Sequence, residues 1–346
     1  MSVPPAALEE LETYLGPRST RDACERLAYS HDAGAPPVLL RRLFGLREPE
    51  AIVRPENEDE LAWLLSWARR HRVRLTPRAA GTSGYGGALP VSGGLLVDLT
   101  GLAGITALDA GAQTVTVRAG TVWQALERAL DPHGLALRTY PSSAPASTVG
   151  GWLAQGGVGY GAWEYGAAEE SVAGASVLLP SGEVRALGEG ELGLVAGACG
   201  TTGIILEVTL RLRALRRERV AGAALADARS LSAWLQALWE SGAPIWSASF
   251  NNAALAALKN RLPAQPAAGH GPRMPLPEAY IALVAAPEDR WQEVEAALER
   301  ANAVAGGRPL PSALAQQEWD ERCRILQIKA LGPSLIPAEA IVPLAG

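Results

Sequence analysis

The sequence predicts an α+β fold, and three features of its patterning indicate this class. An apolar strand at residues 51–53, a helix at 58–71 and a strand at 73–76 form a β-α-β unit. Short strands follow closely between residues 95 and 118. Beyond residue 219, strands and helices alternate at a slower and more regular spacing, which predicts a second α+β domain with an antiparallel, ferredoxin-like sheet.

The N-terminal residues 1–45 are predicted to form a helical segment. Leu8, Leu11 and Leu15 recur at the spacing that places side chains on one face of a helix. The helix of the β-α-β unit carries signals at both ends, because Asn57 can cap its first turn and a basic run closes its last turn.

The rest of the first domain is predicted to be rich in strands. Thr121 to Gln124 has the pattern of a capping box, which predicts a helix from there to about Leu130. Apolar and polar residues alternate from Leu206 to Arg213, which predicts a strand with one solvent-facing side. A charged run at 216–219 marks a boundary. We therefore expect an N-terminal helical segment at 1–45, a first domain at 46–216 and a second, shortened domain at 217–346.

The second domain is predicted to alternate between strands and helices. A Pro/Gly-rich loop is expected at residues 263–277, and a last helix from about Leu314 to Leu331. The other expected elements are strands at 220–225, 245–250 and 280–285 and helices at 231–239, 252–259 and 288–304.

Composition argues against several classes of protein. The chain has 346 residues, 48% of them hydrophobic, so it can bury more than one core. A formal net charge of -5 is a poor match for a surface that binds nucleic acid. Cys24, Cys199 and Cys323 are far apart and the histidines are scattered, so we expect neither a disulfide framework, nor a self-contained iron–sulfur site, nor a structural metal. No signal peptide or transmembrane segment is predicted, which favours a cytoplasmic chain.

The segment from Thr76 to Gly87 has the composition of an anion-binding loop. It follows a strand, its glycines allow a sharp turn and a close approach by a ligand, and Thr82 and Ser83 add hydroxyl donors. A diphosphate suits such a cradle. The segment is neither a P-loop nor the GxGxxG dinucleotide fingerprint. Taken alone, a glycine-rich surface turn explains it equally well.

Two further glycine-rich segments follow. In the segment 141–159, a hydroxyl-rich cap precedes a short helix that contains Gly150 and Gly151. Adjacent glycines weaken a helix, so either a ligand or tight helix packing requires them. The segment from Gly197 to Ile205 leads into the alternating strand and, taken alone, predicts a turn.

Together and in this order, the three segments resemble the FAD-binding domain of the vanillyl-alcohol oxidase / p-cresol methylhydroxylase (PCMH-type) superfamily. The resemblance covers about residues 28–215. The other matching passages are Ile52–Pro55 with the Asn57 helix, Val115–Gly120 with the Thr121 helix, Thr148–Gly151, Tyr165–Gly174 and Gly200–Ile205.

Within that superfamily, the chain resembles the branch of the glycolate oxidase FAD subunit and D-lactate dehydrogenase. Tyr29–Ala33 is similar to the N-terminal passage of this branch, and Trp319–Arg322 and Glu339–Pro343 are similar to passages of its cap domain. The resemblance implies a PCMH-type FAD-binding domain of two α+β subdomains, followed by a truncated ferredoxin-like α+β cap domain that contributes the substrate site.

The resemblance also implies which residues bind FAD. Backbone amides from Ala80 to Gly84 would hold the pyrophosphate, and the Gly203 edge would meet the cofactor through main-chain hydrogen bonds. The residues assigned to the cofactor in this way are Pro77, Arg78, Ala79, Ala80, Gly81, Thr82, Ser83, Gly84, Gly87, Pro141, Ser142, Thr148, Gly150, Gly151, Ala154, Gly156, Gly157, Glu170, Gly203, Ile204 and Ile205.

The implied activity is that of an FAD-dependent oxidoreductase. A 2-hydroxy acid such as glycolate or D-lactate would lose its C2 hydride to flavin N5. A guanidinium suits the substrate carboxylate, and Arg322 is the candidate. The alternative for Arg322 is a position on a solvated helix face.

Departures from the family pattern leave two other functions open. Thr82 stands where covalent members often carry a histidine, which predicts non-covalent FAD. Trp152 and Gln155 stand in place of the residues usual in the family, so the contacts to the flavin are expected to differ. The chain stops at Gly346, and Pro337 stands where some relatives have a substrate-binding lysine. One alternative is a non-catalytic or electron-transferring FAD-binding subunit that needs an iron–sulfur or second flavin subunit to complete the active site. The other is a degenerate member that no longer binds FAD.

Overall fold

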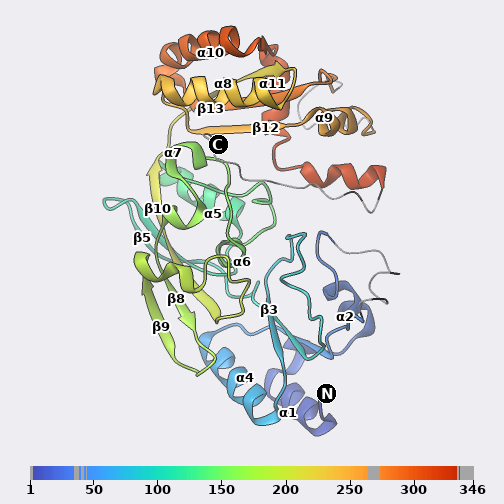
Figure 1. Cartoon of the computed structure of the whole chain (residues 1–346). Coiled ribbons are helices and arrows are strands. Elements are labelled where there is room, and N and C mark those ends of the chain that lie inside the picture. Colours follow the sequence, from blue (N-terminus) through green and yellow to red (C-terminus); the bar gives the residue numbers. More distant parts are fainter. Residues whose placement is uncertain are drawn as a thin grey trace. The chain divides into compact units, whose positions relative to one another are not determined.

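The computed structural model describes the chain except for residues 1–2, 35–38, 40–42, 44, 264–272, 333–334 and 336–346. The chain forms two compact units, whose elements are labelled in Figure 1. Unit 1 consists of Met1–Leu137, Ser143–Gly157 and Ala167–Ala214, and unit 2 of Arg138–Ser142, Val158–Gly166 and Leu215–Gly346. The Glu339–Pro343 passage, Pro337 and part of the loop predicted at 263–277 lie outside the described residues.

The first sheet of unit 1 contains the predicted β-α-β unit. The strand order is β1 (Ser19–Thr20), β2 (Ala51–Val53), β4 (Leu95–Asp98), β3 (Leu75–Arg78), with β2 and β3 both parallel to β4. The strand predicted at 73–76 begins later than expected. The Val73 amide instead closes the preceding helix by donating to the Ala68 carbonyl at 2.9 Å, after Arg72 takes a left-handed conformation with φ of 56°.

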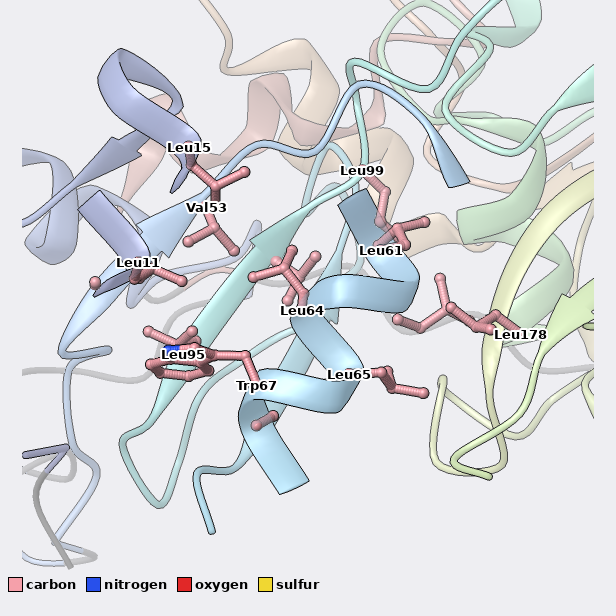
Figure 2. Close-up of a cluster of buried hydrophobic side chains, with 14 of the residues drawn as sticks. Leu11, Leu15, Val53, Leu61, Leu64, Leu65, Trp67, Leu95, Leu99 and Leu178 are labelled. Atoms are coloured by element: carbon pink, nitrogen blue, oxygen red, sulfur yellow. The ribbon is translucent and has the colours of Figure 1, made fainter. Parts of the chain in front are cut away.

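Helices α1 (Pro5–Leu15), α2 (Ala23–Tyr29) and α4 (Glu58–His71) accompany this sheet. Asn57 caps α4 as predicted, because its side chain accepts from the Glu60 amide at 2.9 Å. Figure 2 shows Leu61, Leu64 and Trp67 projecting from α4 into a core that also contains Leu11 and Leu15 of α1. This core packs against the first sheet, whose strand β3 leads into the glycine-rich loop that begins at Ala79.

The second sheet of unit 1 is antiparallel. Its strand order is β5 (Ile105–Asp109), β6 (Thr114–Arg118), β10 (Ile204–Ala214), β8 (Val172–Leu178), β9 (Val184–Gly188), and β7 (Leu135–Leu137) pairs with the end of β10. Strands β5 and β6 lie within residues 95–118, where the sequence predicts short strands. Unit 1 is therefore built from two sheets with accompanying helices, an α+β arrangement as the sequence predicts.

The capping box predicted at Thr121 is wrong. Helix α5 spans Trp123–Leu130, and its N-cap, Val122, makes no side-chain hydrogen bond. The Thr121 hydroxyl instead accepts from the Gly104 amide at 2.9 Å and contacts the Gly104 carbonyl at 3.2 Å. Thr121 cannot cap the helix because its hydroxyl is used in this tertiary contact with Gly104.

Unit 2 contains a four-stranded antiparallel sheet with helices packed against it. The strand order is β12 (Ser247–Asn251), β13 (Tyr280–Pro287), β11 (Glu218–Leu225), β14 (Arg308–Pro309). Helices α8 (Ala228–Ser241) and α10 (Trp291–Ala305) lie side by side over the sheet, and α9 (Ala253–Asn260) contacts β13 (Figure 1). The core between them includes Trp234, whose indole donates to Asn302 at 2.9 Å.

The last helix is shorter than predicted. Helix α11 spans Ser312–Asp320, and a separate 3-10 helix follows at Ile325–Leu331. The helix ends where the Trp319 carbonyl accepts from both the amide and the guanidinium of Arg322, at 3.1 and 2.9 Å. No helix in the described part of the chain is long and apolar enough to span a bilayer.

Candidate cofactor site

The three glycine-rich segments of the sequence line one cleft in unit 1. The cleft encloses about 1010 Å³ of space, and this volume includes open solvent at its mouth. Its walls come from residues 77–88, 143–155 and 195–205, with Leu99 and Ala119 behind them. Three segments that are far apart in the sequence thus line one cleft. The alternative explanation, a glycine-rich surface turn, would not bring them together.

Most of the residues predicted to bind the cofactor lie in this wall. The predicted residues that line the cleft are Pro77, Arg78, Ala79, Ala80, Gly81, Thr82, Ser83, Gly87, Thr148, Gly150, Gly151, Ala154, Gly203, Ile204 and Ile205.

The first loop presents a run of backbone amides without protein partners. From Ala79 to Gly84, no backbone N–H donates a hydrogen bond to any acceptor in the described part of the chain. The loop is partly exposed, so water can serve these groups in the absence of a ligand. Successive free N–H groups form a concave site for an anion, and a diphosphate fits this donor set.

Two carbonyl groups of the same loop accept hydrogen bonds from the segment that contains Ala33. The Ala33 amide donates to the Ser83 carbonyl at 3.0 Å and to the Gly81 carbonyl at 3.3 Å. The Asp32 carboxylate accepts from the Gly34 amide at 2.9 Å and from the Gly86 amide at 2.8 Å. The segment around Asp32 therefore fixes the loop while leaving its remaining amides free.

A cation lies against this loop. The Arg78 guanidinium donates to the Tyr29 carbonyl at 3.1 Å and stacks 5.2 Å from the centroid of the Tyr29 ring. Gly81 has a φ of 63°, and a Cβ there would lie 2.2 Å from Arg78 Nη2. Burial lowers the pKa of Arg78, and within the described residues no carboxylate forms an ion pair with it. A positive charge that forms no ion pair in the described residues and lies beside free amides favours an anionic ligand.

The second segment forms α6 (Val149–Gln155), whose start is tied to the turn after β6. The Thr148 side chain caps the helix by accepting from the Gly151 amide at 3.2 Å. The Gly150 amide donates to the Ala119 carbonyl at 2.8 Å, and a Cβ on Gly150 would lie 2.5 Å from the Ala119 Cβ. Of the two explanations for the paired glycines, tight packing accounts for Gly150, whereas Gly151 is exposed.

The third segment is fastened to the other two. The Cys199 amide donates to the Ala154 carbonyl at 2.7 Å, and a Cβ on Gly200 would lie 2.9 Å from Pro77 Cγ. Ile204 and Ile205 pair with β8, whereas pairing with β6 begins only at Glu207. At Ile204 and Ile205, β10 therefore pairs with β8 on one side only. Both residues line the cleft.

Several predicted residues lie elsewhere. Gly84, Gly156, Gly157 and Glu170 belong to unit 1 but are not part of the cleft wall, and Pro141 and Ser142 belong to unit 2. Gly156 ends α6 with a φ of 74°, and the Gly157 carbonyl accepts from the Ala168 amide at 3.0 Å. The Glu170 carboxylate accepts from the Ala167 amide at 3.0 Å, so these residues shape turns.

Sequence reasoning missed part of the wall. Ser147 lines the cleft, and its Oγ is buried without a hydrogen-bond partner in the described part of the chain. Trp152, which stands in place of the usual asparagine, lines the cleft and packs edge-on against Trp123 at 5.3 Å. The other wall residues that were not assigned to the cofactor from the sequence are Tyr85, Ala88, Leu99, Ala119, Ser143, Gln155, Val195, Cys199, Gly200 and Thr202.

Arg322 lies in unit 2, just after α11. Its Nε and Nη2 donate to the Tyr140 hydroxyl at 3.1 and 2.9 Å, and its guanidinium carbon is 4.5 Å from the centroid of the Trp319 ring. The Tyr160 hydroxyl donates to the Arg322 carbonyl at 3.0 Å. Burial lowers the pKa of Arg322, but its interactions with Tyr140, Cys323 and Tyr160 together outweigh this, so the net pKa lies above its ordinary value. Arg322 is therefore a charged, half-buried group among aromatic rings.

Fold and cleft together indicate an α+β protein with a site suited to a nucleotide cofactor, because the first glycine-rich loop carries a run of free amides. Residues 49–188 match the family model described as an FAD binding domain. Residues 49–188 thus form an FAD binding domain, its fold is that of PCMH-type proteins, and FAD is the cofactor.

Relatives agree with this assignment. The chain is 31% identical over 215 residues to the glycolate oxidase subunit GlcD of Bacillus subtilis, covering 59% of this chain and 44% of that protein. It is 30% identical over 227 residues to the mitochondrial D-lactate dehydrogenase [cytochrome] of Arabidopsis thaliana, covering 63% and 39%. It thus spans less than half the length of either relative.

Solved structures share the fold. An alkyldihydroxyacetonephosphate synthase superposes with a TM-score of 0.78 at 19% identity, covering 95% of this chain and 64% of that one. p-Cresol methylhydroxylase superposes with a TM-score of 0.73 at 16% identity, covering 94% and 71%. The predicted PCMH-type α+β fold is confirmed.

Proposed function

We propose that this chain is an FAD-dependent oxidoreductase that oxidises a 2-hydroxy acid such as glycolate or D-lactate. The observation that carries the proposal is the cleft of unit 1, with its run of free amides from Ala79 to Gly84. The printed names of two relatives, a glycolate oxidase subunit and a D-lactate dehydrogenase, support the substrate class. FAD, when bound, supplies the acceptor for the C2 hydride at flavin N5.

The residues of the cleft wall would hold the cofactor. The amides from Ala79 to Gly84 donate to the diphosphate, and Arg78 adds a positive charge beside them. The start of β10 at Ile204 offers its main chain. Thr82 has no nucleophile that links readily to flavin, so binding is non-covalent. Precipitation with acid tests this mode, because non-covalent flavin stays in the supernatant and covalent flavin pellets with the protein.

Arg322 would bind the substrate carboxylate. Of the five N–H donors of a guanidinium, three are used by Tyr140 and Trp319, which leaves one N–H on each terminal nitrogen without an acceptor in the described residues. Two such donors suit the two oxygens of a carboxylate. The aromatic rings around Arg322 exclude water and strengthen the charge interaction. Unit 2, from about residue 217 onward, is thus proposed as the cap domain.

A second candidate is an FAD-carrying subunit that transfers electrons within a complex. The relative from Bacillus subtilis is named as a subunit, which favours this alternative. An iron–sulfur or second flavin subunit would be the partner. Cytoplasmic location stays a prediction.

The visible spectrum and anaerobic substrate mixing separate these functions. The purified chain is expected to show flavin absorbance, and glycolate or D-lactate is expected to bleach it. Absence of flavin, even after incubation with FAD, would support a degenerate member and contradict both proposals. Flavin that neither substrate bleaches would support the subunit alternative.

A pair of variants tests the substrate site. Arg322→Ala removes two charge-assisted hydrogen bonds, which lowers kcat/KM by about 10- to 100-fold while FAD content stays unchanged. Arg324→Ala is the matched control, because Arg324 is exposed and lies two residues further along the chain. Equal bleaching rates for Arg322→Ala and the parent chain would remove Arg322 from the site.

A further inference from the structure

Two tyrosines of unit 2 hold Arg322 through different groups. The Tyr140 hydroxyl accepts from Nε and Nη2 of the guanidinium at 3.1 and 2.9 Å, and the Tyr160 hydroxyl donates to the backbone carbonyl of Arg322 at 3.0 Å. The Trp319 carbonyl accepts from Nη1 at 2.9 Å. These contacts fix both the main chain and the side chain of Arg322, and Nη1 and Nη2 each keep one further N–H.

The Tyr140 ring is itself fixed by its surroundings. Its main chain exchanges two hydrogen bonds with that of Tyr160, at 3.2 and 2.9 Å. Only 4% of Tyr140 is exposed, and its ring lies 5.9 Å from the ring of Trp246, whose indole donates to the Arg138 carbonyl at 2.9 Å. A Cβ on Gly161 would lie 2.0 Å from the same carbonyl, so the main chain here is closely packed. The hydroxyl therefore has a defined position before any ligand binds.

Tyr140 holds the guanidinium without cancelling its charge. A phenol is an uncharged acceptor near pH 7. Within the described residues no carboxylate forms an ion pair with Arg322, and the adjacent Glu321 instead lies beside Lys259 and Arg273, at 4.0 and 3.1 Å. A carboxylate in place of the hydroxyl would bind the guanidinium more tightly, but it would offset the charge that attracts an anionic ligand. The observed pair therefore keeps the cation both ordered and available.

We propose that Tyr140 is a positioning residue of the substrate site, whose hydroxyl fixes the rotation of the Arg322 guanidinium so that its two remaining N–H groups meet the substrate carboxylate. The inference rests on the proposed function, in which Arg322 binds that carboxylate. A free arginine side chain samples many rotamers, and ordering it before the substrate arrives removes that entropy cost from binding. Because Tyr140 acts through Arg322, its effect should vanish when Arg322 is absent.

The variant Tyr140→Phe keeps the ring and removes only the hydroxyl. Anaerobic mixing with increasing glycolate or D-lactate gives the apparent Kd of the substrate and the limiting rate of flavin bleaching. We expect Kd to rise about 5- to 20-fold and the limiting rate to stay within about twofold, because the carboxylate contact is shared by the ground state and the transition state. FAD content should stay unchanged. Tyr280→Phe is the matched control, since Tyr280 is a half-buried tyrosine on β13 in the same unit, and its Kd should equal that of the parent chain.

A double-mutant cycle separates positioning from a general structural role. In the Arg322→Ala background, adding Tyr140→Phe should leave Kd unchanged, because the group that Tyr140 positions is gone. An equal fold-change in both backgrounds would overturn the inference, as would a Tyr140→Phe chain that binds substrate like the parent. Loss of FAD from Tyr140→Phe would also overturn it, because the hydroxyl would then support the fold. A parent chain whose flavin neither substrate bleaches would contradict the proposed function, and the positioning role would fall with it.

Discussion

Replacing Gly150 with alanine tests whether α6 is held against the turn that follows β6. In an ordinary helix, this change is favourable, because alanine exceeds glycine in helix propensity by about 1 kcal/mol. Here, the new Cβ would lie 2.5 Å from the Cβ of Ala119, 3.0 Å from its Cα and 3.1 Å from its carbonyl oxygen. Carbon atoms pack at about 3.5–4.0 Å, so α6 must retreat by roughly 1 Å.

The retreat has a calculable cost. Overpacking of this kind costs about 1–3 kcal/mol. It also stretches the hydrogen bond from the Gly150 amide to the Ala119 carbonyl, now 2.8 Å, which contributes about 1 kcal/mol. After subtracting the gain in helix propensity, we expect the free energy of unfolding to fall by about 2 kcal/mol, which corresponds to a melting temperature lower by roughly 4–8 °C.

Thermal melts of the apoprotein measure this change, and FAD titration measures the displacement of the cleft wall as weaker binding. Gly193→Ala is the control, because a Cβ there meets no atom within 4 Å. Its melting temperature should stay close to that of the parent chain. If Gly150→Ala melts at the same or a higher temperature than the parent, the packing argument is refuted and the paired glycines need another explanation.

Three further substitutions follow from the same contacts. Gly81→Ala places a Cβ 2.2 Å from Arg78 Nη2 at a φ of 63°, so FAD binding should weaken at least about tenfold by titration, and undiminished affinity would contradict the loop geometry. Asp32→Ala removes the acceptor of two amides and should weaken FAD binding more than Asp32→Asn, whose amide oxygen can still accept one of the two hydrogen bonds; affinities of both variants equal to that of the parent chain would remove Asp32 from the support of the loop. Glu318→Ala removes the fully buried carboxylate that pairs with Lys259 and Arg273 and leaves Glu321 as their remaining partner, so the free energy of unfolding measured by urea should fall by about 1–3 kcal/mol, and an unchanged value would show that Glu321 alone suffices.

Elements with local end signals could be predicted from the sequence. Asn57 and the helix it caps form with the predicted bounds, because the cap and its target amide are three residues apart. Thr121 has an equally good local pattern, but its hydroxyl binds Gly104, which lies 17 residues away. The break after Asp320 has the same origin, since it depends on where the Arg322 side chain points.

The glycine loops could be placed in a cofactor site for a different reason. Their order and composition indicate a ligand, and the cleft brings the predicted segments together. The sequence could not predict which individual atoms lack hydrogen-bond partners in the folded chain. Ser147 and Ser142 look alike in sequence, yet Ser147 lines the cleft and Ser142 belongs to unit 2. That difference arises only when the backbone is folded and its hydrogen bonds are assigned.

The order in which the chain passes between its units has a consequence for folding. Unit 2 takes in Arg138–Ser142 and Val158–Gly166 long before its main stretch begins at Leu215. The contact between Tyr140 and Arg322 joins residues 182 positions apart. During synthesis, the aromatic setting of Arg322 therefore stays incomplete until Arg322 itself has left the ribosome, long after Tyr140 and Tyr160 have been made. An excised fragment that starts at residue 215 would lack Tyr140 and Tyr160, so it could not reproduce this site.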